Sequence, residues 1–159
     1  MMAVIIVSGT PGTGKTYLAK RLAKSLGFKY TDVKRVISKN KLKERYDRKR
    51  RTYVVDEKKL AKILEKMIRD SDENLVIESH MSHFVDPELV DLCIITKCEL
   101  KTLEKRLKNK GYNKEKVREN LDCEIFDICL NEAKENGHKT KIVDTTKNIN
   151  IAELKRIIR

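Results

Sequence analysis

The residues best suited to chemistry lie near the start of the chain, in the segment GTPGTGKT at positions 9–16. Gly9, Gly14, Lys15 and Thr16 satisfy the spacing G-x-x-x-x-G-K-[ST]. Glycines let such a loop bend tightly and aim successive backbone N–H groups at phosphate oxygens, and a following helix directs its positive end at the same anion. The lysine of this pattern reaches the terminal phosphates of a nucleotide, and the hydroxyl ligates Mg²⁺. The segment therefore predicts a nucleotide-binding phosphate loop.

The flanking residues predict the strand and the helix that this loop needs. Residues 3–8 (AVIIVS) form a continuous apolar run with β-branched side chains, which is typical of a strand buried on both faces. Residues 17–26 carry apolar side chains at helical spacing, and Gly27 predicts the end of that helix. The motif therefore has the strand–loop–helix context that a chance match would lack.

The rest of the chain alternates between short apolar runs and amphipathic segments. Further strands are expected at residues 28–32, 74–78, 92–96 and 141–144. Further helices are expected from Asp56 (as N-cap) to Ile68 and at residues 102–107, 114–135 and 151–158. The basic segment 34–51 holds no glycine or proline, so part of it is expected to be helical. This alternation predicts a three-layer α/β fold with a five-stranded parallel sheet, in a single domain over residues 1–159.

The positive charge of the protein is concentrated in that basic segment. The chain of 159 residues has a formal net charge of +12. Residues 34–51 contain ten basic and two acidic side chains and so hold +8 of that charge. Such a block attracts polyanions, and we expect contacts with phosphate groups or RNA there. The alternative is a solvated surface of the kind common in thermophile proteins.

Composition limits the cellular context and the role of the cysteines. No apolar run approaches the roughly 18 residues that a membrane span needs, and the start MMAVIIVSGT lacks the features of a signal peptide. We therefore expect a soluble cytoplasmic protein without a membrane partner. The cysteines are expected to be small buried apolar residues, with a zinc site as the alternative: Cys93, Cys98, Cys123 and Cys129.

The phosphate loop alone does not distinguish GTPases, helicases, transport ATPases and small-molecule kinases. The chain has no N-K-x-D segment for recognition of guanine, and it is too short for a helicase. A compact phosphate-loop domain with one basic insert after its first helix and a short basic insert late in the chain is typical of a nucleoside monophosphate kinase.

Three further segments carry a family resemblance. Residues 26–33 (LGFKYTDV) follow the loop, residues 76–80 read VIESH, and residues 110–133 read KGYNKEKVRENLDCEIFDICLNEA. Together with GTPGTGKT, these segments resemble adenylate kinase isoenzyme six, an archaeal and nuclear family of adenylate-kinase-like ATPases linked to maturation of the small ribosomal subunit. The resemblance covers about the whole chain. Two positions depart from the family pattern, since Glu78 stands in place of the usual aspartate and Lys110 in place of a frequent arginine.

The resemblance implies a P-loop nucleoside monophosphate kinase fold, with a monophosphate-binding region at residues 32–55 and a lid at residues 109–119. It implies phosphoryl transfer from ATP to AMP or another nucleoside monophosphate, with ATP hydrolysis besides and with Mg²⁺ as cofactor. The implied catalytic residues are Lys15, Glu78 and His80. The implied nucleotide-binding residues are Gly12, Gly14, Lys15, Thr16, Tyr17, Arg106 and Lys110. Thr16 would ligate the metal directly and Glu78 would do so through water. With the composition, the resemblance implies a thermophilic archaeal source.

Several of these residues also have purely structural interpretations. Glu78 ends a predicted strand at the edge where ligands gather in open α/β sheets, but a carboxylate there could simply cap the next turn. His80 is expected to point to the same side as Glu78, and His83 makes a generic H-x-x-H with it. Arg106, Lys110 and Lys114 could place cations on the transferred phosphoryl group, or could form an exposed basic helix end. His138 follows Gly137 in an expected turn and needs no role.

A second interpretation makes the same fold an ATP-driven assembly switch. The resemblance implies that such a switch binds a ribosomal protein of the small-subunit platform, with rRNA as a further partner, and that nucleotide state times release during maturation of the rRNA 3′ end. Of this, the residues themselves contribute only the basic block. A nucleotide-binding structural module without turnover is the third alternative.

Overall fold

The sheet of the computed structural model, which describes residues 2–158, contains five strands in the order β2-β5-β1-β6-β7, all parallel. These strands are β1 (Val4–Gly9), β2 (Lys29–Asp32), β5 (Leu75–Glu78), β6 (Leu92–Lys97) and β7 (Thr140–Asp144). The central strand β1 is buried along its whole length, as its continuous apolar run requires. The predicted five-stranded parallel sheet is confirmed.

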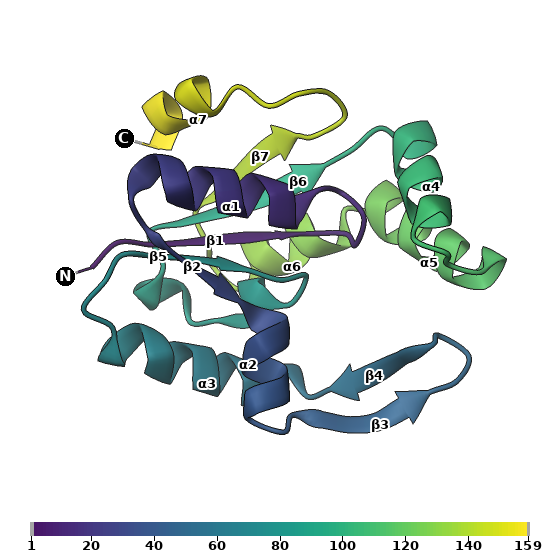
Figure 1. The fold of residues 1–159 in the computed structure, drawn as a ribbon, viewed down its shortest axis with the longest axis horizontal. Coiled ribbons are helices and arrows are strands. Elements are labelled where there is room, and N and C mark those ends of the chain that lie inside the picture. The colour runs from purple at the N-terminus through teal and green to yellow at the C-terminus, as the bar shows by residue number, and fades with distance from the viewer. Residues whose placement is uncertain (1, 159) are drawn as a thin grey trace.

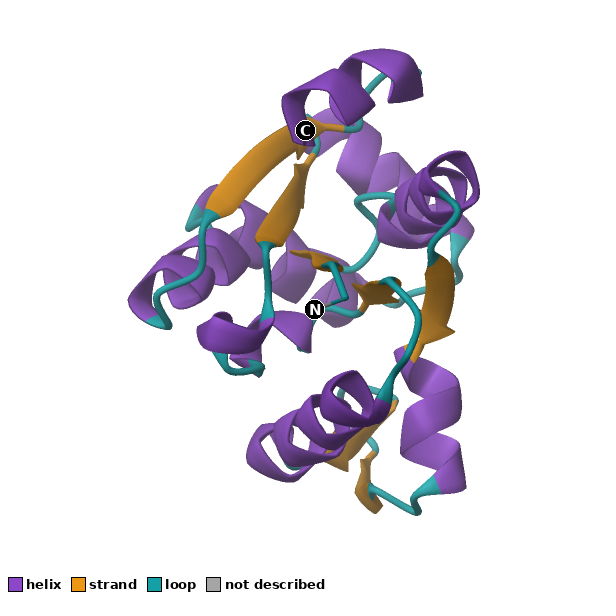
Figure 2. Ribbon diagram, turned by 90° about the vertical axis from the view of Figure 1, so that its left-hand side faces the viewer, coloured by secondary structure: helices purple, strands orange, loops and turns teal. Residues whose placement is uncertain are grey.

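Helices cover both faces of this sheet and make it the middle of three layers (Figures 1 and 2). Helices α1 (Lys15–Leu26) and α7 (Ile151–Ile158) pack on the face formed by Ile5 and Val7 of β1. Helices α3 (Glu57–Asp70) and α6 (Ile128–Glu135) pack on the opposite face, formed by Val4 and Ile6. Alternate residues of one strand thus enter two different cores, so both faces of β1 have to be apolar.

The predicted ends of two helices are confirmed by their caps. Gly27 ends α1 in the left-handed conformation (φ 71°), and its N–H donates to the carbonyl of Ala23. Asp56 caps α3 by accepting hydrogen bonds from the backbone N–H groups of Lys58 and Lys59.

The basic segment folds as a helix only at its start. Helix α2 (Val33–Lys39) bears out the expectation that part of the segment is helical, and it is followed by an antiparallel hairpin of β3 (Lys43–Asp47) and β4 (Thr52–Val55), which was not predicted. The physical reason lies in the side chains: Tyr46 stands opposite Tyr53, the strand TYVV is rich in β-branched and aromatic residues, and Asp47 fixes the turn by accepting from two backbone N–H groups. In Figure 1 the hairpin projects from the sheet and passes beneath α5.

The expected helix over residues 114–135 is two helices. Helix α5 (Lys114–Ile125) ends at Phe126, and α6 begins after Asp127, whose backbone is left-handed (φ 50°). The amphipathic pattern continues through this break and so does not reveal it. Asp127 forms an ion pair with Lys97 of β6, a contact between distant segments that the local pattern does not contain.

Helices α4 (Leu100–Asn109) and α5 form an arm with its own small core. Leu103, Leu107 and Val117 are buried there together with Cys98. The chain turns between the two helices at Gly111, whose φ is 80°. Short 3₁₀ turns η1 (Ser82–Phe84) and η2 (Pro87–Leu89) lie between β5 and β6.

Two of the four cysteines, Cys93 and Cys98, are buried as expected, whereas Cys123 and Cys129 are only half-buried. Among residues 2–158, no helix has the length and the apolar character needed to cross a membrane.

Candidate active site

The phosphate loop lies between β1 and α1, as predicted, and its glycines are needed for its shape. Gly14 precedes α1 with a φ of 85°. At Gly9 a Cβ atom would lie 2.3 Å from Oγ1 of Thr96, so no larger residue fits without displacing β6. The start of the loop therefore packs directly against β6, and this close packing requires glycine at position 9.

Four threonines that sequence reasoning did not single out fix the loop from inside. Oγ1 of Thr13 donates to the carbonyl of Thr10 at 2.6 Å and lies 2.7 Å from Oγ1 of Thr96. Thr145, which follows β7, donates its hydroxyl to the carbonyl of Thr13. All four side chains are buried, so these hydrogen bonds hold the backbone in place without competition from water. Threonine is a common residue in loops and at strand ends, so its presence there did not identify these four residues as supports of the loop.

Lys15 lies inside the curve of the loop. It is 8 % exposed, and its Nζ donates to the carbonyl of Thr10 at 3.2 Å. Burial lowers the pKa of Lys15 to about 8, Glu78 opposes this shift, and Lys110 and Lys34 contribute to it. The effects of Lys34, from α2, and Lys110, at the end of α4, place both cations near the loop.

Glu78 ends β5 directly beside the loop. Its Oε1 accepts from the hydroxyl of Thr16 at 3.1 Å, and its Oε2 accepts from the hydroxyl of Tyr30 at 3.2 Å. Burial and the carboxylate of Glu78 raise the pKa of Tyr30, so its hydroxyl stays protonated and donates. A carboxylate and a hydroxyl at this distance offer the hard oxygen ligands that Mg²⁺ prefers, so the residues present fit this ion.

His80 follows β5 on the same side as the loop. Its surface is exposed, and partial desolvation of the ring, followed by the charges of Lys15, Lys34 and Lys116, lowers its pKa to about 4. The imidazole is therefore neutral at neutral pH and can accept a hydrogen bond on one ring nitrogen.

The other two histidines are structural. His83 is 1 % exposed, and its Nδ1 lies 2.7 Å from the hydroxyl of Ser8. His138, which follows the turn at Gly137, is buried too, and its Nε2 lies 2.9 Å from the carbonyl of His83.

The expected nucleotide-binding residues separate into those at the loop and those on its rim. Arg106 donates to the carbonyl of Thr145 at 2.7 Å and lies beside Gly14. Lys110 is exposed, and burial of its stem, followed by repulsion from Lys34, lowers its pKa. Tyr17 is 59 % exposed and carries the guanidinium of Arg21 over its ring at 5.3 Å.

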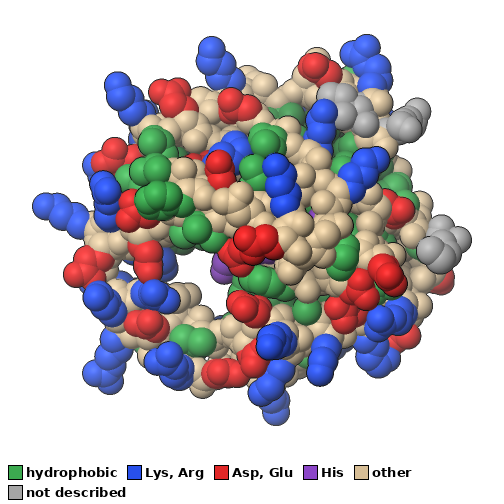
Figure 3. Space-filling model, turned by 180° about the vertical axis from the view of Figure 1, so that it is seen from behind, with side chains coloured by type: hydrophobic (Ala, Val, Ile, Leu, Met, Phe, Trp, Pro, Cys, Tyr) green, Lys and Arg blue, Asp and Glu red, His purple; other side chains and the backbone are tan. Residues whose placement is uncertain are grey.

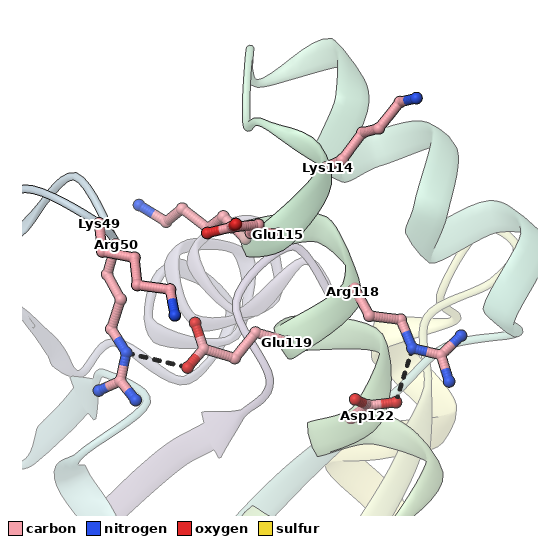
Figure 4. A pocket seen from close by; sticks show the side chains of 8 residues that line it. Lys49, Arg50, Lys114, Glu115, Arg118, Glu119 and Asp122 are labelled. Carbon is pink, nitrogen blue, oxygen red and sulfur yellow. Dashed lines mark ion pairs between the residues drawn. The ribbon is translucent and has the colours of Figure 1, made fainter.

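A cleft of about 570 Å³ separates the hairpin from α5, away from the phosphate loop. Its walls are Lys49 and Arg50 on one side and residues 114–122 of α5 on the other, and Nε of Arg50 pairs with Glu119 across it at 2.9 Å (Figure 4). Lys114 lies on its border and points away from the hairpin (Figure 4), whereas Arg106 lies beside Gly14 and the charge of Lys110 acts on Lys15. From behind, an opening rimmed by basic and acidic side chains is visible in the surface (Figure 3).

Comparisons with known proteins agree with this geometry. A family model described as AAA domain matches residues 5–127. A Methanocaldococcus jannaschii protein named "Putative adenylate kinase" is 35 % identical over 142 residues, which cover 89 % of this chain and 76 % of the relative. An adenylate kinase isoenzyme 6 homolog from Schizosaccharomyces pombe is 36 % identical over 141 residues, covering 88 % and 79 %. A Caenorhabditis elegans protein with that name is 32 % identical over 131 residues, covering 82 % and 72 %.

Solved structures share the fold. A shikimate kinase from Bacteroides thetaiotaomicron superposes with a TM-score of 0.59 and 16 % identity over 99 % of both chains. A gluconokinase from Sinorhizobium meliloti superposes with a TM-score of 0.58 and 15 % identity, over 98 % of this chain and 89 % of the other. The P-loop kinase fold and the identity to the curated relatives lead to one conclusion: the chain belongs to the adenylate kinase isoenzyme 6 family, an adenylate-kinase-like branch of the P-loop kinases.

Proposed function

We propose that the protein transfers the γ-phosphoryl group of ATP to AMP and so forms two molecules of ADP. The observation that carries this proposal is that the phosphate loop, the strand-end carboxylate of Glu78 and cations from separate elements lie together: Lys15, Lys34 and Lys110. Phosphoryl transfer needs little covalent participation by the protein, and positioning with charge stabilisation supplies most of its rate. The proposed site supplies both.

In this proposal the loop and Lys15 bind the terminal phosphates of ATP. Lys15 now donates to the carbonyl of Thr10, and it would exchange that neutral acceptor for a phosphate oxygen. A charged acceptor makes the stronger hydrogen bond, so the exchange favours the bound state. The phosphate charge would also raise the pKa of Lys15 and keep the ammonium protonated.

Thr16 and Glu78 would hold Mg²⁺, the first by its hydroxyl and the second through water. Bound there, the ion would offset negative charge on the β- and γ-phosphates. Tyr30 keeps the carboxylate of Glu78 oriented, because it donates to the oxygen that Thr16 does not use. Glu78 is one methylene longer than the usual aspartate, and the hydrogen bond from Tyr30 compensates by restricting where its carboxylate can lie.

We assign the acceptor to the region of residues 32–55 and the lid to residues 109–119. Arg106 and Lys110 would place positive charge beside the phosphoryl group during its transfer. Closure of the arm formed by α4 and α5, which carries the lid, would exclude water from the site. A neutral His80, two residues after Glu78, would accept a hydrogen bond from water, and this would permit a slower hydrolysis of ATP when AMP is absent.

An assay of ATP consumption with each nucleoside monophosphate, and with none, tests this function. We expect ADP formation to rise most with AMP and to show two ADP per ATP consumed. Consumption that is equal with and without every monophosphate would contradict the kinase proposal and leave an ATPase.

The hairpin supports a second function, as an assembly switch that meets a small-subunit ribosomal protein or rRNA. Tyr46 and Tyr53 are each 50 % exposed and pack edge to face at 5.0 Å, with Nζ of Lys43 at 4.7 Å from the Tyr53 ring. Exposed aromatic rings among cations are typical of surfaces that stack single-stranded bases. Stimulation of ATP turnover by RNA or by the ribosomal protein, without AMP, would favour this switch over a kinase acting alone.

A further inference from the structure

Glu124 is a buried carboxylate that none of the roles above uses. It lies in the last turn of α5 with its side chain 5 % exposed. A charged group in such a position is costly unless its oxygens are hydrogen-bonded, so its partners indicate what it stabilises.

Its partners come from two separate parts of the chain, the phosphate loop and the end of β6. Oε1 accepts from the hydroxyl of Thr10 at 3.1 Å and from Nζ of Lys97 at 2.9 Å. Oε2 accepts from the backbone N–H of Cys98 at 2.8 Å. The carboxylate thus joins the second residue of the phosphate loop to the end of β6 and to the end of α5.

These contacts lie at the base of the arm formed by α4 and α5. The chain enters the arm just after Cys98 and leaves it at Glu124, so the hydrogen bonds that Lys97 and Cys98 donate to Glu124 close the base. Above that base the arm has its own core of Leu103, Leu107 and Val117, which lets it move as one body. Lys110 and Lys116, whose charges act on Lys15 and His80, lie at its far end.

The phosphate loop touches this arm at Gly14, where Arg106 of α4 lies, and at two further places. The first is the hydrogen bond from Thr10 to Glu124. The second is at Gly12, where a Cβ atom would lie 2.8 Å from Cδ2 of Leu107. Thr10 also offers the carbonyl that accepts from Lys15 and Thr13, so a displacement of its side chain would move the acceptors that shape the loop.

We propose that Glu124 is a positioning residue, the pivot through which closure of the arm sets the geometry of the phosphate loop. The inference rests on the proposed function, since it assumes that the loop binds ATP. Glu124 never touches the nucleotide and acts through the hydroxyl of Thr10. Its removal should therefore slow turnover of bound nucleotide more than it weakens nucleotide binding.

The test compares four variants with the wild type: Glu124→Gln, Thr10→Val, Thr10→Ser and the double variant Thr10→Val with Glu124→Gln. The readouts are kcat for ATP consumption with and without AMP, the Kd of ADP by calorimetry, and the melting temperature. Glu104→Gln is the matched control, because it removes the same charge from an exposed position on α4.

We expect Glu124→Gln and Thr10→Val each to lower kcat by about tenfold, the worth of one hydrogen bond to a charged group, with the Kd of ADP changed by less than about threefold. Thr10→Ser restores the donor and should recover most of the loss. The double variant should be no slower than Glu124→Gln, since the contact between Thr10 and Glu124 is the one through which both changes act on the loop. Glu104→Gln should match the wild type.

Effects that multiply in the double variant would overturn the proposal, as would a lower melting temperature with unchanged kcat. If Glu124→Gln fails to fold, the comparison of Thr10→Val with Thr10→Ser decides in its place, and equal kcat values would refute the pivot. A wild type that neither binds ADP nor consumes ATP would refute the proposed function itself. A wild type that does both while the variants equal it refutes only the role of Glu124.

Discussion

The hydroxyl of Thr16 donates to Oε1 of Glu78 at 3.1 Å, across 62 positions of sequence. Parallel pairing of β1 with β5 brings them together, since Val7 and Glu78 are register partners and the loop begins two residues after Val7. Both side chains consequently lie at the carboxyl edge of the sheet, where ligands bind in open α/β folds. This pair is the part of the site where a metal would be held.

Replacement of Thr16 should change the dependence of turnover on Mg²⁺. Thr16→Val keeps the shape and removes the hydroxyl, so we expect half-maximal ATP consumption to need about tenfold more Mg²⁺. Thr16→Ser keeps the hydroxyl and is the matched control. Titration of Mg²⁺ at saturating ATP measures this, and identical curves for the valine and serine variants would remove Thr16 from the metal site.

Glu78→Gln and His80→Ala should impair ATP hydrolysis and leave nucleotide binding intact. Both residues lie at the end of β5, beside the terminal phosphates in the proposed complex, and each loss should lower kcat roughly 100-fold. Calorimetry should give an ADP affinity within about threefold of wild type, because neither change alters the loop. A loss of affinity as large as the loss of rate would mean that these residues build the pocket and take no part in the chemistry.

The free energy of unfolding should fall in mild acid because of His83. Burial, and then the neighbouring His138 and His80, lower the pKa of His83 from 6.5 to about 4. The unfolded chain therefore binds more protons than the folded chain between those two values, so stability decreases as the pH falls through this window, by about 3 kcal/mol at most. Glu132, whose Oε2 lies 3.6 Å from Nε2, is too distant for a hydrogen bond that would stabilise the charged ring.

Urea denaturation of the wild type and of His83→Asn between pH 7 and pH 4 measures this effect. We expect the variant to be less stable at pH 7, because it loses ring packing, and to lose less stability on acidification. Parallel profiles for the two proteins would show that His83 is not the group responsible.

The elements around the phosphate loop were predictable from sequence, whereas the contacts that join distant segments were not. Hydrophobic runs and glycines indicate β1, α1 and their junction, since those signals are local. The bond from Thr10 to Glu124 spans 114 positions and depends on where α5 ends, which a continuous amphipathic pattern concealed. The hairpin was missed because its basic residues suit a helix as well as a strand, and only the pairing of Tyr46 with Tyr53 selects the strand.

The basic hairpin should bind RNA through phosphate contacts that depend on salt. Replacement of Lys43, Arg45, Arg48 and Lys49 by serine should make the salt dependence of RNA affinity shallower, by about 0.7 logarithmic units per decade of salt for each lost contact on a single strand. Four exposed lysines elsewhere serve as the control set when replaced by serine: Lys24, Lys58, Lys62 and Lys139. Fluorescence anisotropy at several salt concentrations measures both sets.

The proposal would be contradicted if the salt dependence of RNA affinity stayed unchanged in the hairpin variant, or changed equally in both variants. The basic residues of the hairpin would then be an ordinary solvated surface. Tyr46→Leu together with Tyr53→Leu separates stacking from charge. We expect this variant to weaken RNA binding by about tenfold or more while the salt slope stays constant.

The most direct test of the account is AMP-dependent formation of ADP by the wild type and by Lys15→Ala. Lys15 is the cation that the loop encloses, and its removal leaves the fold's cores untouched. We expect the wild type to convert ATP and AMP into two ADP, and the variant to lose both this reaction and ATP hydrolysis by at least about 100-fold. Circular dichroism should show a folded variant. Turnover by Lys15→Ala close to that of the wild type would contradict the assignment of the phosphate loop as the active site.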